Sequence, residues 1–179
     1  MSKPGQASHR SLLVDGADMS VSVDTGLDHA LRTAMANFTT GLTIVTTSAG
    51  GRPHGTTLNS VMSVSMDPPK VLLSLARTSS LLARLSRGGT FGINVLAAHQ
   101  DQVALRFATK VHDRFADIAW TDDGAPRLDE THAWILADVA STIPAGDHTL
   151  VLGDVLAAEA SGGRPLAYWQ RTFGTHQAF

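Results

Sequence analysis

The residues with the clearest potential to bind a ligand lie in one stretch, residues 55–75. Its first part alternates hydroxyl and amide side chains with apolar ones, in the order Thr56-Thr57-Leu58-Asn59-Ser60-Val61-Met62-Ser63-Val64-Ser65. Alternation at period two is typical of a β-strand. The polar groups of Thr56, Thr57, Asn59 and Ser60 suit the edge of a flat heteroaromatic ring. A threonine-rich edge strand without a ligand has the same pattern, so both interpretations stay open for this stretch.

A second candidate site follows directly, where Arg77, Ser79 and Ser80 precede leucines at helical spacing. Free backbone N–H groups at the start of a helix, two hydroxyls and a guanidinium suit a phosphate group. An ordinary hydroxyl cap beside a solvated arginine explains the pattern equally well. The third candidate is His148, after the tight turn Gly146-Asp147, although a lone histidine at a strand end is more often a surface residue.

Several established chemistries have no motif in this chain. There is no glycine fingerprint of a dinucleotide fold, no phosphate-binding Walker loop, no His-Glu-x-x-His pair and no nucleophile elbow. The eight histidines lack metal-ligand spacing, so we expect no metal site. Paired carboxylates and a catalytic triad are also missing.

Length and composition limit the classes of protein to which these candidate sites can belong. A chain of 179 residues predicts one domain, with residues 1–27 as a flexible N-terminal arm and residues 28–179 as the folded part. A net charge of −2 argues against nucleic acid as a partner, and no apolar run is long enough to span a membrane. The absence of cysteine and of a signal peptide pattern predicts a cytoplasmic protein.

The elements that position the candidates are predicted to be mainly strands. We expect strands near residues 42–47, 55–75, 90–96, 132–141, 147–158 and 166–169. Short helices are expected after residue 80 and over residues 101–109, and a further helix over residues 29–37 has Asp28 as its N-cap. Its apolar face consists of Leu31, Ala34, Met35 and Phe38. Residues 110–130 are expected to form loops.

The turns predict how these strands connect. The tetrapeptide Gly-Gly-Arg-Pro occurs at residues 50–53 and 162–165, and each copy predicts a hairpin of one antiparallel sheet. Alternating βαβ units are missing, which argues against a parallel sheet. We therefore predict a mainly β protein, an antiparallel barrel that closes its own edges.

Eight short motifs together resemble the flavin reductase family with the FMN-binding split-barrel fold, which supplies the reductase components of two-component flavin-dependent monooxygenases. In chain order the motifs are Phe38-Thr39-Thr40-Gly41-Leu42-Thr43-Ile44-Val45-Thr46-Thr47, Thr57-Leu58-Asn59-Ser60, Ser63-Val64-Ser65 with Asp67-Pro68-Pro69, Phe91-Gly92-Ile93-Asn94-Val95-Leu96, Arg106-Phe107-Ala108, Asp113-Arg114-Phe115-Ala116, Gly146-Asp147-His148-Thr149 with Gly153, and Arg164-Pro165-Leu166-Ala167-Tyr168. They cover roughly residues 28 to 173.

The resemblance implies a split β-barrel of Greek-key type and a homodimer that binds FMN or FAD together with NADH or NADPH. By analogy the isoalloxazine ring is surrounded by Thr40, Gly41, Leu42, Thr43, Thr56, Thr57, Leu58, Asn59 and Ser60. Ser79 and Ser80, with Arg77 nearby, hold the flavin phosphate, and His148 lies near the nicotinamide. Ser65, Asn94 and Phe115 belong to the same motifs and are further cofactor-binding candidates.

The implied activity is NAD(P)H:flavin oxidoreduction by hydride transfer, with reduced flavin passing by diffusion to a partner monooxygenase. No side chain is required as acid or base, and His148 is the one candidate for a direct role. This chain has Leu81 where the family often has threonine, and Met62 and Met66 replace commoner residues.

Two alternatives keep a similar barrel. One is a non-enzymatic flavin-binding or flavin-storage protein. The other is an oxidase of the pyridoxamine-phosphate type, which needs a second basic pocket. Against it, Arg52, Arg114, Arg164 and Arg171 form no cluster in the sequence.

Overall fold

A computed structural model describes residues 25–111 and 113–178 of the chain. The described part contains three helices, α1 (Thr25–Ala36), α2 (Leu82–Leu85) and α3 (Asp101–Ala108). Its strands are β1 (Thr40–Gly41), β2 (Thr43–Ala49), β3 (Arg52–Leu58), β4 (Val61–Met66), β5 (Pro69–Ala76), β6 (Thr90–Val95), β7 (Trp120–Asp122), β8 (Pro126–Leu128), β9 (Ala133–Ala145), β10 (His148–Ala160), β11 (Leu166–Trp169) and β12 (Thr172–Thr175). The prediction of a mainly β fold with a few short helices is confirmed.

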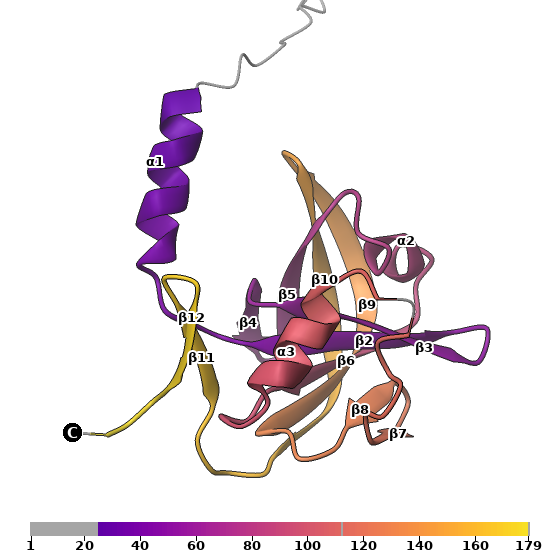
Figure 1. Ribbon diagram of the computed structural model, residues 1–179. Helices are drawn as coiled ribbons and strands as arrows, with labels where there is room; N and C mark the ends of the chain where they lie inside the picture. Colours follow the sequence, from indigo (N-terminus) through magenta and orange to yellow (C-terminus); the bar gives the residue numbers. More distant parts are fainter. Residues whose placement is uncertain (1–24, 112, 179) are drawn as a thin grey trace, which may run out of the picture.

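Most strands belong to one antiparallel sheet of seven, in the order β3-β2-β6-β9-β10-β5-β4 (Figure 1). Strands β1, β11 and β12 form a second sheet, and β7 pairs with β8. Hydrogen bonds among the described residues leave β3 and β4 as the two edges of the large sheet, so the predicted closure into a complete barrel is not observed. These edge strands follow each other in the chain and are joined through residues 59–60, which brings the two ends of the sheet together.

Strand β2 lies at the centre of the packing because its alternating side chains enter two different cores. Val45 joins the cluster that contains α2, together with Phe91 and Ile93 of β6. Ile44 joins the cluster that contains Phe107 of α3. Full burial of side chains of this size stabilises the fold by about 1.5–3 kcal/mol each. The β-branched residues of β2 therefore serve both cores, which explains why this strand is predictable from its sequence.

The turns confirm one of the two predicted hairpins. Residues 50–53 connect β2 to β3 as expected, with Gly50 and Gly51 in the left-handed region at φ 59° and 72°. The second Gly-Gly-Arg-Pro turn, at residues 162–165, connects β10 to β11, and these strands lie in different sheets. Its prediction as a hairpin of one sheet is wrong, because the local turn preference does not determine which strand pairs next.

The longest hairpin is formed by β9 and β10, which begin to pair at Ala145 and His148. It is longer and more tightly turned than predicted, with Pro144 and Ala145 still in the strand. Gly153 of β10 is required by packing, because a Cβ at this position lies 2.5 Å from Cζ of Phe91. The hairpin thereby packs closely over the core and places His148 at its tip.

Helix α1 begins before the predicted N-cap, so Asp28 lies in the first turn instead of preceding the helix. Its carboxylate accepts a hydrogen bond from Nε of Arg32 at 3.0 Å. The proposed boundary of the arm at residue 27 falls within this helix, and residues 1–24 of the arm lie outside the described residues. Figure 1 shows α1 projecting from the sheet, and its end is joined to the β11–β12 turn by the hydrogen bond from the Gln170 N–H to the Ala36 carbonyl, at 3.0 Å.

Candidate functional site

The two segments predicted to surround a flavin ring, residues 40–43 and 56–60, lie next to each other in the fold. Thr43 of β2 pairs with Leu58 of β3, and the Thr43 hydroxyl donates to the Leu58 carbonyl at 2.7 Å. Ser60 continues the surface to β5, because its hydroxyl and backbone carbonyl both bond to Ser74. We call residues 40–43 and 56–60 the ring site.

The ring site offers few free side-chain groups, because several hydroxyls bond to the protein backbone. The Thr57 hydroxyl donates to the Ala104 carbonyl of α3 at 2.6 Å, on the side of the sheet away from α2. Ser65, on the next strand, accepts from the N–H of Asp67 at 3.2 Å. Asn59 is exposed and has no side-chain hydrogen bond to the described residues. The side chains of Thr56 and Asn59 are therefore the ones available to a ligand here.

An unpaired buried hydroxyl marks the other half of the ring site. Thr40 Oγ1 is buried and has no hydrogen-bond partner among the described residues. Such atoms are rare and call for an acceptor or donor that the isolated chain does not supply. The neighbouring Gly41 is exposed, and a Cβ there meets nothing within 4 Å, so the backbone is open to close approach. These two features fit a ligand with polar edges.

Asn94 was predicted to bind the cofactor, and the structure contradicts this. Its side chain is completely buried. The amide nitrogen lies 3.1, 3.2 and 3.3 Å from Ile44 O, Thr46 Oγ1 and Pro126 O, and the amide oxygen accepts the N–H of Leu128 at 2.8 Å. Both ends of the amide are occupied by protein groups, so Asn94 has a structural role joining β2, β6 and β8.

The predicted phosphate site is a turn followed by a single helical turn. Helix α2 has only four residues and its N-cap is Leu81. The site therefore has neither the expected hydroxyl cap nor the dipole of a longer helix. The Ser79 hydroxyl accepts only a long bond, 3.4 Å, from the Leu82 N–H. Ser80 is exposed, and its N–H has no acceptor among the described residues. An anion would bind here through hydroxyl and N–H groups and nearby arginines.

The segment just before Ser79 adjoins His148 and Asp147. His148 pairs with Ala76 across β5 and β10, and the Arg77 N–H donates to the Asp147 carbonyl at 3.0 Å. The His148 Nδ1 lies 2.8 Å from Asp147 Oδ1, which leaves Nε2 free for a ligand. This hydrogen bond, reinforced by the charge of His148, lowers the pKa of the exposed Asp147 carboxyl. Arg77 itself does not line the pocket described next.

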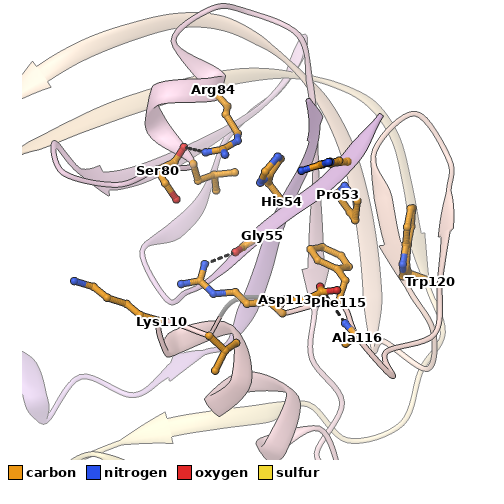
Figure 2. Close-up of a pocket in the computed structure, with 14 residues that line it drawn as sticks. Pro53, His54, Gly55, Ser80, Arg84, Lys110, Asp113, Phe115, Ala116 and Trp120 are labelled. Atoms are coloured by element: carbon orange, nitrogen blue, oxygen red, sulfur yellow. Dashed lines mark hydrogen bonds between the residues drawn. The ribbon is translucent and has the colours of Figure 1, made fainter. Parts of the chain in front are cut away.

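Beyond Ser80 the surface opens into a pocket of about 1130 Å³ (Figure 2). It is lined by residues 52–55 of β3, by Ser80, Leu81 and Arg84 around α2, and by residues 110–111, 113–116 and 120 after α3. We call it the basic pocket, because Arg52, Arg84, Lys110 and Arg114 all line it. Figure 2 shows Ser80 and Arg84 on one side of the Gly55 backbone and Lys110 and Asp113 on the other.

Aromatic side chains form one wall of the basic pocket. Phe115, a predicted cofactor-binding residue, lines it, and its ring packs edge-on against Phe107 and Trp120 at centroid distances of 4.9 and 5.7 Å. These contacts fix the wall. His54 faces the same space, and burial, followed by the charges of Arg84 and Arg52, lowers its pKa.

Ser80 and Phe115 of the basic pocket were predicted site residues, but the grouping of its basic side chains was not predicted. Arg52 and Arg114 are 62 positions apart, and they approach because the β2–β3 hairpin and the loop after α3 meet at Gly55. Of the four arginines that form no cluster in the sequence, Arg52 and Arg114 line this pocket, whereas Arg164 and Arg171 do not. The sequence feature that could have indicated this group is a basic residue beside each turn. Because many surface turns have such a residue, the feature does not distinguish a pocket.

Comparison with known protein families identifies the family of the chain. The model of the flavin reductase like domain matches residues 35–177. The chain belongs to this family. The match includes the ring site, Ser79–Ser80, the basic pocket and His148.

Known flavin reductases resemble the chain in both sequence and structure. It is 44% identical over 142 residues to a probable flavin reductase of Rhizobium meliloti, covering 78% of this chain but 46% of that protein. It is 41% identical over 147 residues to an FMN reductase (NADH) of Agrobacterium fabrum, covering 81% of this chain and 84% of the relative. The styrene monooxygenase flavin reductase of Pseudomonas putida S12 superposes with a TM-score of 0.77 at 31% identity, covering 82% of this chain and 97% of that one.

The likeness to solved flavin reductases confirms the predicted split-barrel fold. The chain spans about half the length of the Rhizobium protein. Among the described residues, no helix is long and apolar enough to cross a membrane. Within the same residues, no group of three or more histidine, cysteine, aspartate or glutamate side chains is arranged to hold a metal ion.

Proposed function

We propose that this flavin reductase family member is an NAD(P)H:flavin oxidoreductase that reduces FMN or FAD. The observation that supports the proposal is that β5 and the turn after it connect to all three predicted sites: Ser74 bonds to Ser60, the turn contains Ser79–Ser80, and Ala76 pairs with His148. The unpaired Thr40 hydroxyl and the free N–H of Ser80 give this surface unused hydrogen-bonding groups where a flavin ring and phosphate fit. The sequence relatives support the same activity, since one is an FMN reductase (NADH).

Flavin, when bound, supplies the electron-accepting chemistry of this reaction. The protein's part is to hold two ligands in reactive contact, which lowers the barrier by fixing their orientation. Thr40, Thr56 and Asn59 are placed to bind the polar edge of the flavin ring, and Ser79 and Ser80 its phosphate. His148 presents Nε2 to the nicotinamide from the opposite strand. Because much of the ring site is backbone, alanine substitutions there should mostly spare flavin binding.

The activity is tested by following the oxidation of NADH and NADPH, each with FMN and with FAD. We expect oxidation that depends on both protein and flavin, with reactions lacking added flavin as the control. A flavin-storage protein, the alternative, would stay yellow through purification and leave NADH unoxidised. No oxidation in any of the four combinations would contradict the proposed function.

Replacing His148 with alanine is expected to raise the KM for the nicotinamide substrate by about tenfold, the effect of losing one hydrogen bond to a ligand. The KM for flavin should change by less than about twofold. The matched control is His99→Ala, because His99 is also exposed and paired with a carboxylate, that of Glu130, at 3.2 Å. A larger effect on flavin than on the nicotinamide would remove His148 from the nicotinamide side.

We also propose that the working form is a homodimer. The apolar face of α1 is exposed in the single chain, with exposed fractions of 68% for Leu27, 59% for Leu31 and 55% for Met35, and Phe38 beyond the helix is 64% exposed. Further apolar side chains, Met62, Val64 and Met66, are exposed on β4. A soluble chain rarely leaves so much apolar surface uncovered. A second copy, which presents the same apolar face, is the occupant we propose.

The reduced flavin is proposed to pass by diffusion to a partner monooxygenase. The likeness to the flavin reductase of styrene monooxygenase supports this role. The exposed ring site is consistent with release, since neither Asn59 nor Ser60 is enclosed. The cytoplasmic location expected from the sequence stays a prediction.

A further inference from the structure

The turn between β11 and β12 has a backbone conformation that its two residues do not favour. Trp169 pairs with Thr172, which leaves Gln170 and Arg171 as the loop. Their φ angles are 45° and 63°, in the left-handed region. A two-residue hairpin loop with positive φ at both positions is usually built from asparagine, aspartate or glycine, because larger side chains are strained there. Such strain persists where the surrounding structure or a function requires it.

Gln170 completes the hydrogen bonding at the end of α1. The last four carbonyl groups of a helix have no partner within the helix. Three of these carbonyls accept from the two residues directly after the helix, namely those of Thr33, Ala34 and Met35. The fourth, the Ala36 carbonyl, accepts the Gln170 N–H at 3.0 Å. Nε2 of Gln170 also donates to Oδ1 of Asn37 at 2.8 Å. We call the two bonds made by Gln170 the clasp.

The clasp fixes the direction of α1 within a single chain. Residues 26–35 are all exposed, and Ala36, which takes part in the clasp, is half-buried. No other hydrogen bond or ion pair joins residues 27–36 to a strand or to another helix of the described chain. Figure 1 shows α1 standing clear of the sheet, with its C-terminal end beside the β11–β12 hairpin. Without the clasp, the helix would be tethered to the fold mainly by the residues that follow it.

The hairpin that forms the clasp also holds the first part of the ring site. Thr40 of β1 pairs with Tyr168 of β11. Tyr168 and Phe173 pack against the core that contains α3, with 5.7 Å between their ring centroids, so the hairpin is anchored to the fold. Asn37 and Thr40 are three positions apart, a span of at most about 11 Å. One anchored hairpin therefore fixes both ends of the segment 37–40.

Fixing this segment prepares the ring site for a ligand. Thr40 has the buried hydroxyl without a partner, and the backbone of Gly41 is open to close approach. Groups that are already held in their bound position lose less entropy when a ligand binds. We propose that Gln170 is a positioning residue for flavin binding, which acts through the clasp. The identity of the ligand rests on the proposed function.

The test compares Gln170→Gly with Arg171→Gly. Both variants place glycine at a positive φ in the same turn, so both relieve its strain. Only Gln170→Gly removes the side-chain bond to Asn37. Arg171 is exposed, and its side chain forms no hydrogen bond with the described residues. Neither variant should lower the midpoint of unfolding in urea, because the relief of strain offsets the greater freedom of glycine in the unfolded chain.

Hydrogen exchange of the chain without a ligand reports directly on the segment. We expect the amides of residues 37–41 to exchange about fivefold faster in Gln170→Gly and at an unchanged rate in Arg171→Gly, because only the first variant loses a hydrogen bond that holds the segment. Such a change at an unchanged or higher urea midpoint separates local positioning from support of the whole fold.

Fluorescence titration with FMN and with FAD measures the effect on the ligand. Gln170→Gly should bind either flavin about fivefold more weakly, and Arg171→Gly within about twofold of the unchanged chain. The KM for NADH or NADPH should change by less than about twofold in both variants, because His148 lies on β10, outside the β11–β12 hairpin.

Asn37→Ala removes the same side-chain bond from its other end. If Gln170 acts through the clasp, the double variant Asn37→Ala/Gln170→Gly binds flavin no more than about twofold more weakly than the weaker of the two single variants. Independent effects that multiply in the double variant would contradict an action through this bond.

The positioning role is overturned if Gln170→Gly exchanges and binds flavin as Arg171→Gly does, or if flavin binding falls only together with the urea midpoint. Flavin binding that depends on Gln170, in a protein that oxidises no NAD(P)H, would contradict the proposed function and leave the positioning role intact. Oxidation of NAD(P)H by a chain whose flavin affinity ignores Gln170 would do the opposite. If the unchanged chain bound neither FMN nor FAD, both proposals would be wrong.

Discussion

Replacing Asn94 with alanine is expected to lower the free energy of unfolding by about 3 kcal/mol. The change removes the acceptor of the buried Leu128 N–H and a donor to the Ile44 and Pro126 carbonyls. A buried polar group left without a partner costs about 1–3 kcal/mol, and this position is completely buried. The measurement is equilibrium unfolding in urea, with the slope of the transition unchanged.

Asn59→Ala is the matched control for this prediction, because Asn59 is exposed and lies in the ring site. Its unfolding free energy should change by no more than about 0.5 kcal/mol. Together the two variants separate an asparagine that supports the fold from one available to a ligand. If Asn94→Ala were as stable as the unchanged chain and instead weakened flavin binding, the structural role assigned to Asn94 would be wrong.

Asn94 shows that a motif can predict a strand without predicting which way a side chain on that strand faces. The motif Phe91-Gly92-Ile93-Asn94 identified a strand of the sheet correctly, because β6 is strongly apolar and β-branched. Whether its one polar side chain faces a ligand or the core depends on Pro126 and Leu128, which arrive from β8. Strand β8 has three residues and no periodicity, so the sequence predicted a loop there.

The strands and helices that were predicted well are those with enough residues to show a period. Helix α3 and strands β2 and β11 lie within two residues of their predicted positions. Pairing between strands that are distant in the chain was harder to predict from the sequence. Nothing near residues 162–165 indicates that β11 leaves the main sheet to pair with β1 and β12.

The residues of the candidate site also differ in how far they could be predicted from the sequence. The ring-site residues and Ser79–Ser80 could be proposed from the sequence because they are close in the chain and carry family motifs. The basic pocket was missed because Arg52, Arg84 and Arg114 come from three separate segments whose meeting is decided by the packing of α2 and α3 on the sheet. Local patterns cannot report a charge cluster that only tertiary structure assembles.

Helix α1 provides the second large expected effect. The double substitution Leu31→Glu/Met35→Glu is expected to convert the proposed dimer into monomers. Light scattering across a range of protein concentrations measures this change. Full burial of each side chain contributes about 1.5–3 kcal/mol, so two charges on this face should weaken association by between about a hundredfold and ten-thousandfold. Both side chains are exposed in the single chain, so its own unfolding free energy should change little.

His29→Glu/Thr33→Glu is the matched control, because residues 29 and 33 lie on the opposite side of α1 from Leu31 and Met35. It adds the same two negative charges to the same helix, so the general effect of charge is equal in both variants. If the two variants dissociate alike, the apolar face is not the interface. If the unchanged chain is already a single chain at every concentration, the homodimer is ruled out, and the exposed face of α1 needs a different partner.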